Sequence, residues 1–278
     1  MSSNTEQLGK AGILFSRAFM RVMFASVQGW KNNVSGDVEQ FQMVGLDGSN
    51  LEVSLQHSTS SEVKGVLLLC HPFLKYGLHY FHKNEMSQAF CDAGYHVLCF
   101  NFKGFGRSNI KGHAFWQDVL SVANMAQQRF GGLPIHLLGC SFGGFHLTHA
   151  LAEDKSPFSS VVLDSVPPSV TVFFKGGLIA KAMRWISNSR LSTATGTRPI
   201  VHSLKQVKGL PIVFFYGDAD EYMPHEDVRE LKVQCPEVSF VKFANCGHLE
   251  IYKLNKQEYV DAVTSFFCHG KLSDEGKR

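Results

Sequence analysis

Residues 135–147 read IHLLGCSFGGFHL, an apolar run that leads into a glycine-rich turn around Ser141. The turn fits the pattern G-x-S-x-G, and a stretch compatible with a helix follows it. Glycines on both sides of a serine allow a strand to turn sharply into a helix. Ser141 would then stand at the helix N-terminus, where backbone N–H groups favour developing negative charge. A glycine-rich turn can also simply cap a helix, so this motif alone does not identify a nucleophile.

Short apolar runs and longer helical patterns alternate along the chain around this turn. Half-exposed strands are expected at 38–44 and 51–56, with a turn signal at Asp47-Gly48. Buried strands are expected at 66–70, 96–100, 135–138, 161–163, 212–216 and 238–243. Helices are expected at 82–93, 113–129, 143–152, 172–186, 226–233 and 256–267. The alternation predicts an α/β fold: an eight-stranded, mostly parallel sheet with helices on both faces and a site at the carboxyl ends of its strands.

Two later loops contain the partners that a serine nucleophile requires. A serine hydroxyl needs a base within hydrogen-bond reach, and the base needs an acid to orient it. Residues 217–224 read GDADEYMP directly after an expected strand, and residues 245–248 read NCGH directly after the last one. The order serine, acid, histidine at three strand ends makes Ser141 the candidate nucleophile and His248 the candidate base. Asp218, Asp220 and Glu221 are all placed to supply the acid.

The sequence resembles the α/β-hydrolase superfamily from about residue 38 to about residue 268. Besides these three motifs, the resemblance rests on His71-Pro72-Phe73, where the family has His-Gly and an oxyanion residue, and on NFKGFGRS at 101–108, which is similar to Asp-x-Arg-Gly-x-Gly-x-Ser. It implies the α/β-hydrolase fold with a catalytic triad of Ser141, Asp220 and His248. Asp220 matches the family's acid, three residues after a glycine and four before a proline. Asp164 is a second candidate for the acid, because some relatives place the acid after the sixth strand, although a cap of a helix or turn is the favoured interpretation of this residue.

The resemblance also implies an oxyanion hole built from backbone N–H groups. Phe142 would supply the first group, and Phe73 the second, because Pro72 has no N–H to donate. The chain departs from the family pattern at Pro72, which replaces glycine, and at Asn101 and Lys103, which replace aspartate and arginine. His71, His79 and His82 are interpreted either as lining the pocket entrance or as solvated loop residues.

Composition limits the partners. The 278 residues carry a net charge of +3 without a dense Lys and Arg block, which argues against nucleic acid. We expect a hydrolase domain at 36–270 and a solvated tail at 271–278. Seven cysteines are an odd number without a disulfide-framework spacing, which favours a reducing, cytoplasmic location. No C-x-x-C pair occurs, so no structural zinc is expected. His146 and His149 are expected to pack on their helix without metal, and no cofactor is expected because no nucleotide-binding motif occurs.

Two segments bear on the substrate. The lead-in at 1–35 contains an amphipathic helix in which Arg17 and Arg21 argue against a membrane span, so residues 10–30 are expected to pack on the domain, form a homodimer or contact a membrane surface peripherally. Residues 165–210 leave room for a small lid, with a helix at 172–186 and a hinge at Gly176-Gly177. The alternative for this helix is an ordinary cover for the sheet.

These observations predict a serine hydrolase that cleaves a carboxylic ester or thioester, with an acyl or lipid-like substrate favoured, through an acyl-enzyme. A serine peptidase or acyltransferase would use the same residues. A non-catalytic ligand-binding protein is less favoured, because Ser141, Asp220 and His248 are all intact. Dehalogenase chemistry is excluded, because it would need a carboxylate at position 141.

Overall fold

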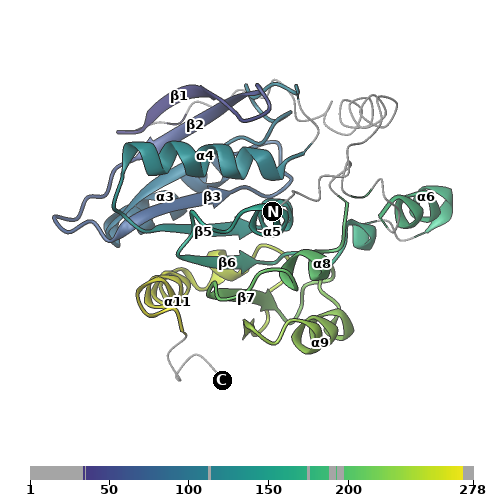
Figure 1. Cartoon of the computed structure of the whole chain (residues 1–278). Coiled ribbons are helices and arrows are strands. Elements are labelled where there is room, and N and C mark those ends of the chain that lie inside the picture. Colours follow the sequence, from purple (N-terminus) through teal and green to yellow (C-terminus); the bar gives the residue numbers. More distant parts are fainter. Residues whose placement is uncertain are drawn as a thin grey trace.

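One eight-stranded sheet organises the chain in the computed structural model, which describes residues 34, 36–111, 114–173, 176–187, 192 and 197–271. The strand order is β1-β2-β4-β3-β5-β6-β7-β8 (Figure 1). The strands are β1 (Glu39–Val44), β2 (Asn50–Gln56), β3 (Gly65–Cys70), β4 (Tyr95–Phe100), β5 (Ile135–Cys140), β6 (Ser160–Asp164), β7 (Ile212–Gly217) and β8 (Val238–Phe243). β2 runs antiparallel to β1 and β4, and the other pairs are parallel. The predicted sheet is confirmed.

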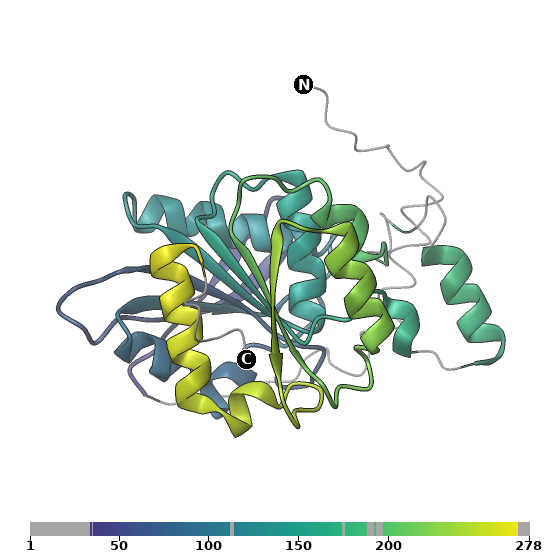
Figure 2. The ribbon, with the colours of Figure 1, turned by 90° about the horizontal axis from the view of Figure 1, so that it is seen from below.

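Helices cover both faces of this sheet (Figures 1 and 2). The first face carries α4 (Trp116–Arg129), α5 (Phe142–Glu153), α8 (Ile200–Leu204) and α9 (His225–Gln234), whose apolar side chains share one core with the sheet. The second face carries α2 (His79–Lys83), α3 (Met86–Asp92), α10 (Ile251–Leu254) and α11 (Lys256–His269), which form the other core. The continuous apolar runs of β3, β5, β6 and β7 are buried throughout, because both faces are covered.

Three local differences separate the structure from the prediction. The helix expected at 82–93 is divided into α2 and α3, because Glu85 takes a left-handed conformation with φ of 62°. The helix expected at 172–186 is a 3₁₀ turn, η1 (Val170–Phe173), followed by α6 (Gly177–Ser187), which begins at Gly177 with φ of 77°. The short helices α8 and α10 were not predicted, because four or five residues are too few to show a helical period.

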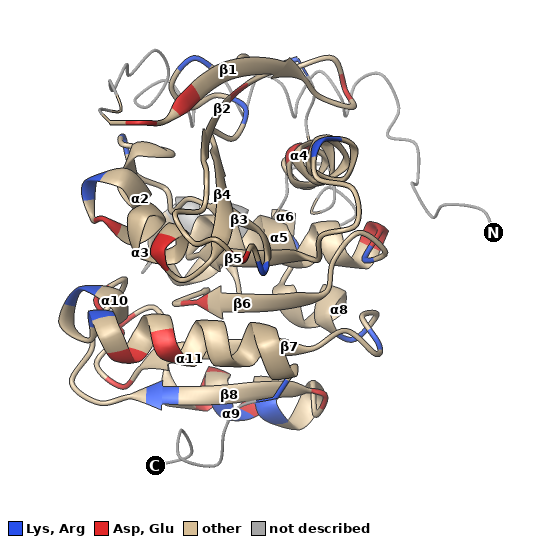
Figure 3. Cartoon of the chain, turned by 90° about the vertical axis from the view of Figure 1, so that its left-hand side faces the viewer, with Lys and Arg blue, Asp and Glu red and all other residues tan. Residues whose placement is uncertain are grey.

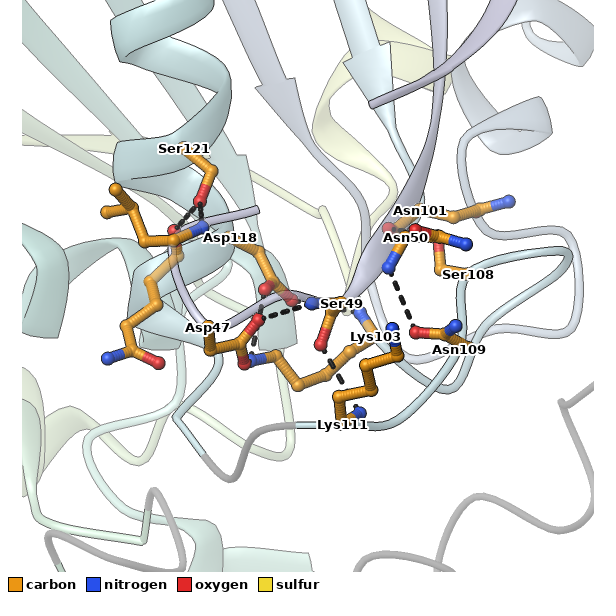
Figure 4. A network of polar contacts seen from close by, with 12 residues as sticks. Asp47, Ser49, Asn50, Asn101, Lys103, Ser108, Asn109, Lys111, Asp118 and Ser121 are labelled. Carbon is orange, nitrogen blue, oxygen red and sulfur yellow. Dashed lines mark hydrogen bonds and ion pairs between the residues drawn. The ribbon is translucent and has the colours of Figure 1, made fainter. Parts of the chain in front are cut away.

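Lys103, which stands where the family pattern has arginine, is the centre of a buried ion-pair network. The Lys103 side chain is fully buried and forms ion pairs with Asp47, before β2, and with Asp118 Oδ1 on α4, the latter at 3.2 Å (Figure 4). The Lys103 backbone N–H also donates to Asp118 Oδ2 at 2.9 Å. Burial raises the pKa of Asp118 to about 7, against the opposing charge of Lys103. This network ties the β1–β2 loop and the loop after β4 to α4.

Asn101, which stands in the same loop where the family pattern has aspartate, uses both ends of its side-chain amide. Its Oδ1 accepts the backbone N–H of Leu78 at 2.8 Å, and its Nδ2 donates to Glu52 Oε2 at 2.7 Å. An aspartate could accept the first hydrogen bond but could not donate the second, and its charge would face Glu52. The amide is therefore the side chain that both neighbours require.

Charged residues lie mainly on the outer helices, the edge strands and the loops, whereas the central strands are largely uncharged (Figure 3). Both signs are mixed across α9, α10 and α11 in this view. In the described part of the chain, no helix has the length and apolar character needed to cross a membrane. The predicted helix within residues 10–30 lies outside the described residues, as does most of the predicted tail.

Replacement of Lys103 by methionine tests the buried network. Lys103→Met would leave Asp118 buried without its counter-charge, so we expect the free energy of unfolding to fall by about 3–5 kcal/mol in urea titrations. The matched control is Lys208→Met, which removes the exposed pair with Glu237 and should change stability little. Equal effects of the two substitutions would contradict a stabilising role for the buried network.

Candidate active site

Ser141 occupies a strained turn between β5 and α5. Its φ of 49° and ψ of −115° are unusual for a residue with a side chain, and its N–H donates to the Asp164 carbonyl oxygen at 2.8 Å. A Cβ on Gly143 would overlap the carbonyl oxygen of Cys70, and a Cβ on Gly139 would overlap the backbone of Gly144. The glycines predicted from the motif are therefore required by close backbone contacts. The strain and the crowding hold the hydroxyl at the carboxyl edge of the sheet.

The structure brings together the three side chains predicted to form the triad. His248 Nε2 lies 2.9 Å from Ser141 Oγ, and His248 Nδ1 lies 2.8 Å from Asp220 Oδ2. Ser141 and Asp220 are each about 4% exposed, whereas the His248 ring is partly accessible. The carboxylate can only accept, so Nδ1 carries the ring proton, and Nε2 is left to accept from the serine hydroxyl. This protonation state is the one in which His248 can act as a base towards Ser141.

The loops after β7 and β8 are joined to each other by hydrogen bonds. The Ala219 N–H donates to the Cys246 carbonyl at 3.1 Å, and the Asn245 N–H donates to Asp218 Oδ1 at 2.7 Å. Asp218 is thus engaged in holding the histidine loop. Asp220 Oδ1 accepts the N–H of Tyr222 at 2.9 Å, which leaves Oδ2 for the imidazole. Among the neighbouring acids, the geometry favours Asp220.

Asp164, the second candidate for the acid, has other partners. Its carboxylate accepts hydrogen bonds from the Ser165 hydroxyl at 2.9 Å and from the Tyr259 hydroxyl at 2.8 Å. His248 Nδ1 is directed at Asp220 instead. In the described part of the chain, its side chain bonds the hydroxyl groups of Ser165 and Tyr259 and no backbone N–H, so the expectation that it caps a helix or a turn is wrong.

Phe73 and Phe142 come from two segments in direct contact. Phe142 is the first residue of α5, and the first N–H groups of a helix lie outside its internal ladder. The Gly143 backbone packs against the carbonyl groups of Cys70 and His71, just before Phe73. The rings of Phe73 and Phe142 meet edge to face with centroids 5.4 Å apart. Both predicted oxyanion residues therefore lie beside the nucleophile turn.

The histidine that precedes this loop is buried, which corrects its interpretation as a residue of the entrance or of a solvated loop. His71 Nε2 accepts the N–H of Phe102 at 3.2 Å, so Nδ1 carries the proton and donates to the Pro72 carbonyl at 2.8 Å. Burial lowers the pKa of His71 to about 4, so the ring is neutral at pH 7. The ring fixes Pro72 and thereby the backbone direction of Phe73. His82 likewise bridges Ser54 and Ser87, at 2.9 Å each.

His146 and His149 are buried on α5, where they pack among aromatic rings. The His146 ring lies 4.4 Å from Phe142 and 4.5 Å from Phe115, and His149 Nδ1 lies 2.7 Å from Ser203 Oγ. Within the described residues, no group of three His, Cys, Asp or Glu side chains is arranged to hold a metal ion.

Exposed apolar side chains lie near Ser141 and His248. Phe73 is 39% exposed and Phe173, at the end of η1, is 45% exposed. The Phe173 ring packs on Tyr222 at 4.8 Å, and Tyr222 packs on His248 at 4.9 Å. Tyr222 was not among the predicted site residues, although its position two residues after Asp220 places it in the same loop as the candidate acid. The first turn of the predicted lid segment is thus connected to the imidazole through one aromatic ring.

Comparison with known proteins gives a family model and several partial relatives. A model of the alpha/beta hydrolase fold matches residues 65–191. An uncharacterized 31.7 kDa protein of the Escherichia coli traX-finO intergenic region is 31% identical over 97 residues, 32% of this chain and 33% of that protein. Lysophosphatidylserine lipase ABHD12 of Xenopus tropicalis is 23% identical over 199 residues, 62% of this chain and 50% of that protein. The chain spans about a third to a half of these relatives.

Solved structures match over most of the chain. A Pyrococcus furiosus esterase superposes with a TM-score of 0.66 at 16% identity, covering 85% of this chain and 96% of that one. A thermostable carboxyl esterase of Bacillus coagulans superposes with a TM-score of 0.64 at 13% identity, covering 84% and 99%. At such low identity, the likeness establishes the fold.

Proposed function

Because the chain is a member of the α/β-hydrolase superfamily, we propose that it is a serine hydrolase that cleaves a carboxylic ester or thioester through an acyl-enzyme. One observation carries this proposal: the hydrogen-bonded chain from Ser141 Oγ through both nitrogens of His248 to Asp220. Three residues from distant parts of the sequence meet with the polarity that proton transfer requires. The esterase and lipase names of the relatives support the same reaction class.

In the proposed reaction, the Ser141 oxygen attacks the substrate carbonyl carbon while His248 Nε2 takes the hydroxyl proton. Asp220 holds the Nδ1–H in place and stabilises the imidazolium that forms. The carbonyl π electrons move to oxygen, and the N–H groups of Phe73 and Phe142 stabilise that oxyanion. Each donor of this kind contributes about 3–4 kcal/mol to transition-state stabilisation.

Collapse of the tetrahedral intermediate then breaks the bond to the leaving group. The electron pair of that bond leaves with the alcohol or thiol, which takes the proton back from His248 Nε2. Water enters next and loses a proton to His248 as its oxygen attacks the acyl carbon. A second collapse releases the carboxylic acid and restores the Ser141 hydroxyl.

The exposed apolar side chains favour an acyl substrate. Phe73 borders the proposed oxyanion hole, Tyr222 packs on His248, and Phe173 of η1 packs on Tyr222. Such a border binds methylene groups, and burial of each contributes about 0.8 kcal/mol. We propose that η1 and α6, which stands out from the rest of the molecule in Figures 1 and 2, form a small lid over the acyl chain. A cytoplasmic location stays a prediction.

Labelling with a fluorophosphonate tests the nucleophile and its base. We expect the probe to label the wild-type protein at Ser141, because it reacts with an activated serine hydroxyl. Ser141→Ala should abolish the label, and His248→Ala should reduce it at least 100-fold, on the order of the loss expected for a general base. Intact-mass and peptide mass spectrometry measure both.

His225→Ala, which removes an exposed histidine at the start of α9, is the matched control and should label like wild type. Labelling of folded His248→Ala at the wild-type rate would contradict the proposal. So would the failure of folded wild-type protein to react.

A series of p-nitrophenyl esters of increasing acyl length tests the substrate class. We expect kcat/KM to rise by up to about fourfold per methylene group until the apolar border is filled. Phe173→Ala should flatten this rise, whereas Val233→Ala, which alters an exposed residue on α9, should not. Equal rates along the series would contradict an acyl-binding border. Faster turnover of a peptide anilide, or acyl transfer to an added alcohol, would favour a peptidase or an acyltransferase.

A further inference from the structure

The Asp164 carboxylate is buried beside the triad, yet the proposed reaction does not use it. Asp164 ends β6, which lies between β5, before the nucleophile, and β7, before the acid. Its backbone carbonyl already accepts the Ser141 N–H. In the described part of the chain, no lysine or arginine forms an ion pair with its side chain. Burying a carboxylate without a cation costs free energy unless hydrogen bonds compensate for the lost water. The groups that hydrogen-bond the Asp164 carboxylate therefore need to be identified.

Two hydroxyl groups satisfy this carboxylate. The Tyr259 hydroxyl, from α11 and 95 residues away, donates to Oδ2 at 2.8 Å, and the Ser165 hydroxyl donates to Oδ1 at 2.9 Å. The Cys140 thiol lies 3.8 Å from Oδ2. Asp164 is thereby attached to a helix on the second face of the sheet, and its second oxygen fixes the rotation of the Ser165 hydroxyl.

The orientation of Ser165 connects Asp164 to the catalytic histidine. The single hydroxyl proton is used on Asp164, so a lone pair of Ser165 Oγ is available to accept the Leu249 N–H, 3.3 Å away. Leu249 follows His248 directly. A hydrogen-bonded path therefore runs from Tyr259 through Asp164 and Ser165 to the backbone of the histidine loop.

Backbone strain collects along the same path. The described non-glycine residues with positive φ include Ser165 at 53°, Asn245 at 56° and Leu249 at 62°. Left-handed conformations are unfavourable for serine and leucine and persist only where surrounding contacts enforce them, whereas asparagine tolerates them. The two strained positions are Leu249, directly after His248, and Ser165, which contacts it. Leu249 is also buried in the second core, and the contact from Ser165 is the hydrogen bond that its N–H makes in this conformation.

We propose that Asp164, Ser165 and Tyr259 form a positioning network that holds the His248 loop where Nε2 reaches the Ser141 hydroxyl. This inference rests on the proposed function and adds positioning residues to it. None of the three touches the reacting atoms. They act by fixing the backbone of residue 249, and hence the direction of the ring one residue earlier.

Kinetics of p-nitrophenyl butyrate hydrolysis by the full chain test the network. Ser165→Ala removes the acceptor for Leu249 and should lower kcat on the order of 10-fold to 100-fold while KM stays close to wild type, because the imidazole is misplaced and the acyl border is intact. Asp164→Asn should also lower kcat. The double variant should be no worse than Ser165→Ala, because both substitutions break one path.

The matched control is Ser160→Ala, in the same strand. It removes a buried hydroxyl that bonds His136 at 2.8 Å at the opposite end of β6. It should lower the melting temperature without lowering kcat. If Ser165→Ala lowered only the melting temperature, as Ser160→Ala should, the network would be structural and the proposal overturned. Additive losses in the double variant would also overturn the shared path.

NMR spectroscopy of the imidazole rings tests the positioning network independently of the proposed function. Long-range proton–nitrogen spectra of the imidazole rings, assigned with His248→Ala, report which ring nitrogen carries the proton. Wild type should show His248 protonated at Nδ1, and Ser165→Ala should show a mixture of tautomers. An unchanged spectrum would overturn the network, whether or not the protein turns over an ester. Wild-type protein without hydrolysis or fluorophosphonate labelling would overturn the proposed function alone.

Discussion

The hydrogen bond between the Ser141 hydroxyl and His248 Nε2 is the contact on which the rest of the site depends. It joins residues 107 positions apart at a distance of 2.9 Å. Such a contact is possible because β5, β6, β7 and β8 are parallel neighbours, so the loops after them begin at one edge of the sheet. The sheet brings the three loops to the same edge, and local contacts then set the distances between the side chains.

Those local contacts are mostly made by the backbone and are unusually tight. Glycines 139, 143 and 144 permit approaches that any Cβ would block, and Gly143 presses the start of α5 against the strand end before Phe73. Positive φ values at Ser141, Ser165 and Leu249 place strained residues around the hydrogen bond between Ser141 and His248. The buried His71 ring is neutral and is held at both nitrogens, so it adds rigidity to the Phe73 loop without adding charge. The site is therefore rigid without a bound ligand, as the proposed stabilisation of an oxyanion by fixed N–H groups requires.

Two kinds of sequence pattern predicted the central strands of the sheet and the meeting of Ser141, Asp220 and His248. The continuous apolar runs marked the central strands, and the glycine spacing with the order of Ser141, Asp220 and His248 marked the strand ends that meet. Other features leave no local pattern. The left-handed Glu85 that divides α2 from α3 carries no glycine signal, and the bond from Tyr259 to Asp164 spans 95 residues. The roles of Asn101 and Lys103 depend on Glu52, Asp47 and Asp118, which only the folded chain brings near.

A crystal structure of the protein after reaction with a fluorophosphonate would test the central arrangement most directly. We expect phosphorus bonded to Ser141 Oγ, with the phosphoryl oxygen within hydrogen-bond distance of the N–H groups of Phe73 and Phe142, and His248 Nε2 beside the adduct. Phosphorus on another side chain, or a phosphoryl oxygen turned into solvent with His248 remote from Ser141, would contradict the proposed arrangement.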